Sequence, residues 1–165
     1  MSSDASPDFE VRRVSAKELL ELRRRVLRAD NPESVVEDAR DAEEASRHFG
    51  GFLGPRVVAS ASWFSALAPV NPELRSYQLR YMAIDFDVQG RGFGGLVVDT
   101  ALKELRSLGV EQVWANARDS ALGFYVATGW SAVVGSEFLS HETQLPHTVI
   151  FRYLSNATPS GAGGG

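Results

Sequence analysis

The sequence predicts a mixed α/β (α+β) layer fold, and three observations lead to this class. The chain has 165 residues, a length typical of one domain with a sizeable core. Short apolar or alternating segments, which are typical of strands, are interspersed with helical periodicities. One stretch joins the two patterns directly: an apolar run that ends at Ile84 leads into a glycine-rich loop, and a helical pattern begins at Phe93.

The N-terminal part is expected to form a strand and then a helix. Residues 9–13 alternate in polarity, and Ser15 with Glu18 forms a capping-box pattern that begins a helix. This helix is expected to bury Leu19, Leu22 and Val26. Its other face carries four arginines, for which a solvated surface is the expected role: Arg23, Arg24, Arg25 and Arg28.

The next part should contain a hairpin and a third strand. Asn31-Pro32 ends the helix, and the acidic segment 33–44 that follows is either a second short helix or an irregular loop. Its charges either keep a linker in solvent or attract a cationic amine. Residues 48–53 and 56–64 read as a hairpin, 65–75 as a loop with two prolines, and 76–84 as the next strand.

Residues 89–95, Gln-Gly-Arg-Gly-Phe-Gly-Gly, form the loop around which the chain is organised. A helix N-terminus has unpaired N–H groups and a partial positive charge, and glycines let those groups approach an anion. Arg91 adds a cation, and Gly95 lies in the first turn, where Gly costs about 1 kcal/mol relative to Ala. The loop therefore predicts a phosphate-bearing ligand. Apolar residues at one helical face then recur until Gly109 ends the helix: Phe93, Leu96, Val97, Ala101, Leu105 and Leu108.

The C-terminal part should add a strand, a helix and a pair of strands. The expected strand covers 110–115, and a helix over 121–128 would be capped by Ser120 or Asp119 and stopped by Gly129. Strands over 131–139 and 148–154 would be joined by the loop 141–147, in which Pro146 prevents a regular ladder. The expected order is β-α-α-β-β-β-α-β-α-β-β.

Composition narrows the classes of partner. A net charge of −4 and a pI near 5.4 argue against a nucleic-acid surface, and the absence of Cys excludes disulfides, thiolate metal sites and a Cys nucleophile. The first eight residues lack the regions of a signal peptide, and no apolar run approaches membrane-spanning length. These features predict a cytoplasmic protein without a membrane or metal site. Residues 1–8 and the Gly-rich tail 155–165 are expected to be disordered around a single domain over 9–154.

Two motifs fit the glycine loop. Gly90, Gly92 and Gly95 match the dinucleotide fingerprint G-x-G-x-x-G. Gln89, Gly92 and Gly94 match Q/R-x-x-G-x-G/A, the acetyl-CoA pyrophosphate loop of the GNAT superfamily of N-acetyltransferases. The dinucleotide motif needs a strand within one or two residues and a longer doubly wound sheet, whereas four residues intervene here and only about seventy follow the loop.

A second segment resembles the same family. Residues 116–130, Asn-Ala-Arg-Asp-Ser-Ala-Leu-Gly-Phe-Tyr-Val-Ala-Thr-Gly-Trp, resemble the GNAT segment that runs from an Asn to A-x-x-F-Y-x-x-x-G-F/W. The stretches 79–83, 135–138 and 146–147 resemble a bacterial-type GNAT subgroup. The resemblance implies a mostly antiparallel sheet of six to seven strands, with helices on both faces and a splay between the fourth and fifth strands.

The resemblance also implies roles for individual residues, with acetyl-CoA as the acyl donor. The loop amides would hold the pyrophosphate, Met82 and Ile84 would pair with the pantetheine arm, and the Met82 N–H would face the thioester oxygen. Asn116 would orient the cofactor, and Tyr125 would protonate the departing thiolate. The residues assigned to the cofactor are Met82, Ile84, Gln89, Gly90, Arg91, Gly92, Phe93, Gly94, Gly95 and Asn116.

The chemistry of Tyr125 agrees with that role, but the base is less defined. Tyrosine and thiol have ordinary pKa values of about 10 and about 8.5, so a tyrosine O–H can share the charge of a forming thiolate. Gln78 stands where the histone-acetylating branch carries its Glu base, and an amide cannot accept the proton. His147, His48 and Glu137 are the candidates for proton acceptor, directly or through a water, with His147 preferred because histidine titrates near neutrality.

Three functions are left open by these observations. The leading one is an N-acyltransferase that moves acetyl from acetyl-CoA to the amine of a small molecule or peptide by direct attack. The second is an acyl-CoA-binding sensor without turnover, which Gln78 favours and Tyr125 disfavours. The third is a nucleotide-dependent oxidoreductase. The identity of the amine, the acyl chain length and the choice between monomer and homodimer are not specified by the sequence.

Overall fold

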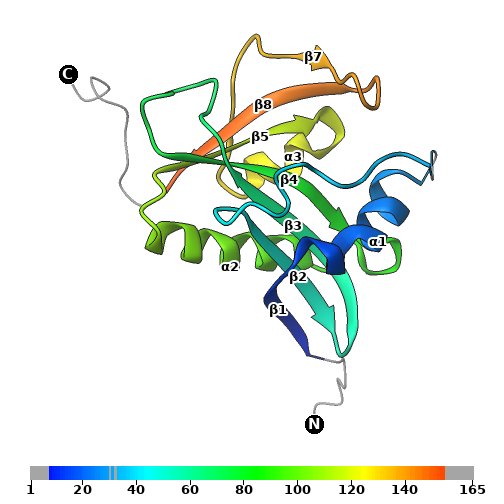
Figure 1. The fold of residues 1–165 in the computed structure, drawn as a ribbon. Helices are drawn as coiled ribbons and strands as arrows, with labels where there is room; N and C mark the ends of the chain where they lie inside the picture. The colour runs from blue at the N-terminus through cyan, green and yellow to red at the C-terminus, as the bar shows by residue number, and fades with distance from the viewer. Residues whose placement is uncertain (1–7, 30, 32, 155–165) are drawn as a thin grey trace. The chain divides into compact units, whose positions relative to one another are not determined.

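The computed structural model describes residues 8–29, 31 and 33–154, and Figure 1 labels their helices and strands. The expected disorder of residues 1–7 and 155–165, and the expected helix break at Pro32, lie outside the described residues. The chain forms two compact units, Met1–Trp63 with Tyr81–Ala101, and Phe64–Arg80 with Leu102–Gly165. Strand β4 and helix α2 each begin in one unit and end in the other. The expectation of a single domain stays a prediction.

The first unit contains an antiparallel set of strands that the sequence largely predicts. Strand β1 (Phe9–Val14) pairs with β2 (Arg47–Leu53), which forms a hairpin with β3 (Arg56–Ser65). Gly54 supplies the left-handed turn residue, with a φ of +60°. The unit also holds the last part of β4 (Ser76–Ile84) and the first part of α2 (Phe93–Ser107).

The first helix is irregular. It consists of a 3₁₀ turn η1 (Ala16–Leu19), a single α-helical turn α1 (Leu20–Leu22) and a π-helical segment η2 (Arg23–Leu27). The Glu18 carboxylate accepts from the N–H of Ser15 at 3.0 Å, which is the Glu half of the predicted capping box. Residues 33–46 form turns, so the irregular alternative is the one observed and the second helix of the expected order is absent.

Helical segments cover both faces of the sheet in this unit, as expected. Two consecutive glycines of β2 show this coverage, because adjacent residues of a strand face opposite sides of the sheet. A Cβ at Gly50 would lie 3.4 Å from Cδ2 of Leu19, in η1, whereas one at Gly51 would lie 2.7 Å from Cε1 of Phe9. The Phe9 ring stacks on Phe93 of α2 with 4.0 Å between centroids. A small cluster of Val58, Val88 and Phe93, with Phe9, Leu53 and Ile84 against it, fills the α2 side.

The second unit is built around two long antiparallel strands, β5 (Gln112–Arg118) and β8 (Pro146–Tyr153), which lie side by side in Figure 1. The N-terminal part of β4 pairs with β5 in parallel, over Ser76–Gln78 and Gln112–Trp114, although both strands continue further. Such a short parallel pairing is what a splay between the fourth and fifth strands requires. Helix α3 (Leu122–Ala127) follows a 3₁₀ turn η4 (Asp119–Ala121).

Several boundaries in the second unit differ from expectation. Strand β5 begins and ends later than the predicted 110–115, because residues 108–111 complete the turn after α2 at Gly109. The predicted strand 131–139 is two short strands, β6 (Ser131–Ala132) and β7 (Phe138–Leu139), separated by a turn in which Gly135 has a φ of +82°. Pro146 begins β8, the position at which a strand accepts proline, so β8 starts earlier than predicted.

Two side-chain predictions were wrong. Neither Ser120 nor Asp119 caps the helix, because the Asp119 carboxylate instead accepts from the Thr148 hydroxyl at 2.8 Å. Leu96 is 50% exposed, whereas Val98 and Leu102 are buried, so the buried stripe of α2 is rotated slightly from the predicted one. No helix in the described ranges combines the length and apolar character needed to cross a bilayer.

Two glycines should respond to alanine in opposite directions. Gly51→Ala introduces a methyl group against the Phe9 ring and 3.1 Å from Cβ of Ala59, and the stacking on Phe93 restricts the movement of Phe9. We expect it to destabilise the protein by about 1–3 kcal/mol. Gly123→Ala, in α3 with no atom within 4 Å of the new Cβ, is the control and should stabilise by about 0.5–1 kcal/mol. Thermal unfolding measures both, and equal effects of the two substitutions would contradict the packing described here.

Candidate functional site

The glycine loop joins β4 to α2 in the first unit and presents the start of a 15-residue helix. Gln89 anchors it, because its side-chain Nε2 donates to the carbonyl of Ile84 at 3.0 Å. Gly90 and Gly92 have φ values of +81° and +82°, so the backbone itself requires glycine at both positions. The N–H groups of the first turn of α2 have no partner further back in the helix, and they form an anion-attracting end.

Gly95 differs from the other loop glycines. It lies inside α2 with no positive φ, and a Cβ placed on it would meet no atom within 4 Å. Neither backbone conformation nor packing within the chain therefore requires glycine there, although glycine weakens the helix. A ligand that approaches the backbone closely would explain the residue, so the site fits the phosphate group expected from the sequence.

Arg91 supplies a cation to the same loop. Its guanidinium Cζ lies 4.9 Å from the centroid of the Phe93 ring, and the residue is exposed. Within the described part of the chain it makes no ion pair. The first-turn amides, the open space at Gly95 and this cation all suit an anionic ligand.

The end of β4, where Met82 and Ile84 lie, leads into this loop. Both residues are partly buried. Tyr81, immediately before Met82, has a φ of +58°, which is an outlier for a bulky residue inside a strand. A left-handed residue in a strand rotates the following peptide group away from the regular alternation. The Tyr81 conformation therefore decides where the Met82 N–H points.

The turn between β4 and the loop is fixed by charge. The buried Asp85 carboxylate accepts from Arg25 at 2.7 Å, from Arg56 at 2.9 Å and from the N–H of Phe86 at 3.0 Å. Arg56 also donates to Asp87 at 2.7 Å. This hydrogen bond from the Arg56 guanidinium lowers the pKa of Asp87, and the two aspartates raise the pKa of Arg56. The 3₁₀ turn η3 (Phe86–Val88) is held by these bonds.

Arg23 corrects the expected solvated face of the first helix. It is 0% exposed and donates to Asp41 at 2.9 and 3.0 Å, to the carbonyl of Val36 at 2.8 Å and to Oγ of Ser62 at 2.8 Å. Arg25 also has an internal partner, in Asp85. The charge pattern at helical spacing resembled a surface, but the partners lie far along the chain, in the acidic segment and in β3. Asp41 therefore neutralises a buried arginine and does not face a substrate amine.

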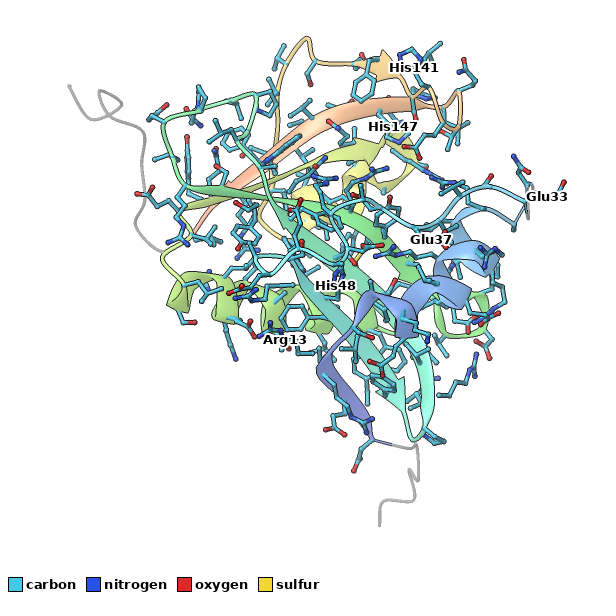
Figure 2. The ribbon with its side chains drawn as sticks, in the orientation of Figure 1. Arg13, Glu33, Glu37, His48, His141 and His147 are labelled. Carbon is cyan, nitrogen blue, oxygen red and sulfur yellow. The ribbon has the colours of Figure 1, made fainter. Side chains whose placement is uncertain are left out.

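His48 is excluded as a proton acceptor by its surroundings. It lies on β2 (Figure 2), buried, with Nε2 2.9 Å from the carbonyl of Asp41 and Nδ1 2.7 Å from Oγ of Ser62. Since a carbonyl only accepts, Nε2 carries the hydrogen and Nδ1 accepts from Ser62. Burial lowers the pKa of His48, which keeps it neutral. Both ring nitrogens are thus used inside the protein.

In the second unit, Asn116 lies within β5 and is exposed. Tyr125 lies in α3, 6% exposed, with edge-on contacts to Phe124 and Trp130 at 5.1 and 5.4 Å between centroids. Burial raises the pKa of Tyr125, so the phenol stays protonated at neutral pH. Among the described residues its hydroxyl makes no hydrogen bond, and this O–H group is therefore available to an external acceptor.

His147 lies on β8 (Figure 2), where it is buried opposite Arg118 of β5. Its Nδ1 is 2.9 Å from the carbonyl of Leu145, so Nδ1 carries the hydrogen and the lone pair is on Nε2. One nitrogen thus has a structural role while the other is in the form that accepts a proton. The predicted base therefore has a suitable tautomer.

The remaining candidates are less suited to proton transfer. Gln78 is 8% exposed on β4, in register with Trp114 of β5, and its amide cannot act as a base. Glu137 is exposed, in the turn before β7. Arg80 pairs with Glu142 at 3.0 Å. In sum, the first unit brings together Met82, Ile84 and the loop 89–95, and the second unit carries Asn116, Tyr125 and His147.

The sequence matches the Acetyltransferase (GNAT) family over residues 16–130. It is 31% identical over 122 residues to the uncharacterized N-acetyltransferase YitI of Bacillus subtilis (strain 168), a match that covers 74% of this chain and 82% of the relative.

Solved structures share the fold. Escherichia coli ElaA has a TM-score of 0.71 at 19% identity, over 88% of this chain and 99% of its own. FeeM, an N-acyl amino acid synthase from uncultured soil microbes, has a TM-score of 0.70 at 12% identity, over 90% and 92%. These matches confirm the mixed α+β fold with a parallel β4–β5 pair and leave the oxidoreductase alternative without support. The family match and the Bacillus relative show that the chain belongs to the GNAT family of acetyltransferases.

Proposed function

We propose that this acetyltransferase transfers an acetyl group from acetyl-CoA to a primary amine of a small molecule or peptide by direct attack. The observation that carries the proposal is the start of α2. It offers backbone N–H groups without a partner in the helix. Arg91 makes no ion pair among the described residues, and neither φ nor packing requires the glycine at position 95. Acyl-CoA supplies the activated thioester when bound, and the residues present fit its pyrophosphate.

The chain's own residues have distinct tasks in this proposal. Residues 89–95 bind the pyrophosphate, and the N–H of Met82 donates to the thioester oxygen as charge develops on it. The amine nitrogen would bond to the thioester carbonyl carbon and pass its proton to Nε2 of His147, which would release it to solvent. The C–S bond would break, and the departing thiolate would take the proton of Tyr125, which solvent would restore.

The burial of Tyr125 and the tautomer of His147 support these two roles. A raised pKa keeps Tyr125 in the donor form, and an O–H without an internal acceptor can donate to a thiolate. The bond from Nδ1 to Leu145 orients the His147 ring and leaves Nε2 basic.

A second function, an acyl-CoA sensor without turnover, is favoured by one observation. Gln78 replaces the carboxylate base of the histone-acetylating branch and is buried, so it offers no proton acceptor. A sensor would bind acetyl-CoA as tightly but would release no CoA in the presence of amines. Turnover with any amine that falls on Tyr125→Phe substitution would exclude it.

Gly95→Ala should separate binding from stability. Gly90 and Gly92 are poor positions for this test, because any side chain there is strained at positive φ. At Gly95 a methyl group has open space, so the free protein should gain up to about 1 kcal/mol of stability. Acetyl-CoA binding, measured by calorimetry, should weaken about 10-fold to 100-fold, as expected for losing one charge-assisted hydrogen bond.

The control for Gly95→Ala is Asp99→Ala, an exposed substitution one turn further along α2. It should bind acetyl-CoA at least as tightly as the wild type, because it removes a negative charge. Unchanged binding by Gly95→Ala would contradict the pyrophosphate site, and NADH should not bind to any of the three proteins.

Tyr125→Phe should lower kcat by about 10²-fold with little change in acetyl-CoA affinity, because the thiolate loses its proton donor. The release of CoA thiol with a panel of arylamine, α-amine and lysine-like acceptors provides the assay. Tyr153→Phe removes a hydroxyl that bonds Asn71 at 2.9 Å and should leave kcat unchanged. Equal effects of the two substitutions would argue against the acid role.

His147→Asn should also lower kcat by about 10²-fold. Asparagine can retain the donor to Leu145 while it removes Nε2, so the structural bond survives and the base is lost. His141→Asn, at an exposed histidine, is the matched control. An unchanged kcat in His147→Asn would point to another base.

A further inference from the structure

The π-helical segment η2 reaches both ends of the β4 backbone that leads into the glycine loop. Arg23 contacts Tyr81, and Arg25 contacts Asp85. The residues between these two contacts, 82–84, are those proposed to receive the pantetheine arm and the thioester. All the residues involved belong to the first unit. π-helical turns occur frequently at functional sites.

The first end of this segment is held in an unfavourable conformation. A left-handed Tyr81 costs of order 1–3 kcal/mol, and such strain persists only where the surroundings impose it. Three contacts do so. The Arg23 Cζ lies 4.0 Å from the ring centroid, the Tyr81 hydroxyl donates to Asp38 at 3.2 Å, and the Tyr81 carbonyl accepts from Oγ of Ser60 at 3.0 Å.

Arg23 is suited to impose a conformation because its guanidinium is buried and hydrogen-bonded to several elements. Its guanidinium is fully buried and donates to the carbonyl of Val36, to both carboxylate oxygens of Asp41 and to Ser62. Ser62 in turn donates to His48 at 2.7 Å. The planar guanidinium is hydrogen-bonded to several groups, and the Tyr81 ring stacks on its face.

Ion pairs hold the other end of this backbone segment, at Asp85. The Asp85 carboxylate pairs with the guanidinium of Arg25 at 2.7 Å and with that of Arg56 at 2.9 Å, and the Asp85 N–H donates to the carbonyl of Val58 at 2.8 Å. Arg25 is itself oriented by Glu21 at 2.7 Å, four residues earlier on the same helix. Side chains of one helical segment, Arg23 and Arg25, therefore contact the backbone region on both sides of 82–84, together with partners from other elements.

Stability alone does not account for this arrangement. A buried ion pair contributes little compared with apolar residues of the same volume, and replacing it is often neutral or stabilising. A strained tyrosine also lowers stability. Both features are explained if they set the direction of one peptide group.

We propose that Arg23 and Arg25 are positioning residues that fix the backbone of 82–84, with Arg23 acting through Tyr81 to aim the Met82 N–H at the thioester oxygen. This inference rests on the proposed function, because it assumes that acetyl-CoA is the ligand. Free CoA carries a thiol in place of the thioester. The ratio of the CoA and acetyl-CoA dissociation constants therefore reports the contacts of the acetyl group, and the infrared frequency reports the contact to its carbonyl oxygen.

The test compares both ligands and observes the carbonyl directly. Calorimetry gives the two dissociation constants, and isotope-edited infrared spectroscopy of acetyl-CoA labelled with ¹³C at the thioester carbonyl gives its stretching frequency. The variants are Arg23→Lys, Arg25→Lys and Tyr81→Leu, with Tyr81→Phe to retain the ring under Arg23. Arg24→Lys, between the two arginines and partly exposed, is the matched control.

In the wild type the bound carbonyl frequency should fall relative to free acetyl-CoA. Arg23→Lys and Tyr81→Leu should lose at least half of that shift and weaken acetyl-CoA binding about fivefold or more, with CoA binding changed less than twofold. Arg25→Lys should lose less of the shift, because Arg56 still holds Asp85. Arg24→Lys should resemble the wild type, and Tyr81→Phe, which loses the Asp38 contact but keeps the ring under Arg23, should lose less of the shift than Tyr81→Leu. Tyr81→Leu leaves the Arg23–Asp41 pair intact, so it remains informative if Arg23→Lys does not fold.

Three results would overturn the inference, and they differ in what else they affect. Variants with lower melting temperatures but an unchanged carbonyl frequency and an unchanged affinity ratio would make Arg23 and Tyr81 merely structural and leave the proposed function intact. Acetyl-CoA binding by the wild type without a carbonyl shift would remove the Met82 contact but keep the ligand. Failure of the wild type to bind acetyl-CoA would overturn the proposed function together with the inference.

Discussion

The buried pair of Arg23 and Asp41 is the interaction on which the first unit depends. Removing one member of such a pair strands the other charge in the interior, at about 3–5 kcal/mol. Asp41 comes from a segment without helix or strand, and the pair joins this segment to the first helix. The same guanidinium reaches β3 through Ser62 and β4 through Tyr81. A single side chain thus ties an irregular loop to two strands.

Local patterns in the sequence were enough to predict the elements that bear the candidate site. The bounds of β4 match the predicted 76–84, and α2 begins at the predicted Phe93. Both succeed because their signals are local: an apolar run of strand length, glycines where φ is positive, and a 3.6-residue period. The hairpin around Gly54 was predictable for the same reason. The role proposed for Tyr125 required the family motif, since an aromatic residue on an apolar helix face has no distinctive pattern.

Several predictions failed because the partners are distant in sequence. Four arginines at helical spacing have the same pattern whether they face water or an aspartate eighteen positions away, as Arg23 faces Asp41. His48 was a candidate base in the sequence because its two hydrogen-bond partners, the Ser62 hydroxyl and the Asp41 carbonyl, are not near it in the chain. Nothing in the sequence indicated the left-handed conformation of Tyr81, because the residue that usually marks a positive φ is glycine. Long-range polar contacts decide these cases, and periodicity does not encode them.

The glycines of the loop do not all carry the same information about function. Gly90 and Gly92 have positive φ, so a tight turn alone explains them, whether or not anything binds. Gly95 has neither a positive φ nor a close neighbour, and its position in a helix makes glycine unfavourable. Gly123 shares these two features, but only Gly95 adds them to the unpaired amides at the start of a long helix and to the nearby Arg91, and this combination favours an anionic ligand outside the chain. Tyr81 is also unfavourable for stability, because its backbone is strained. Here, however, three contacts within the chain maintain the strain, and a relaxed strand would not need them.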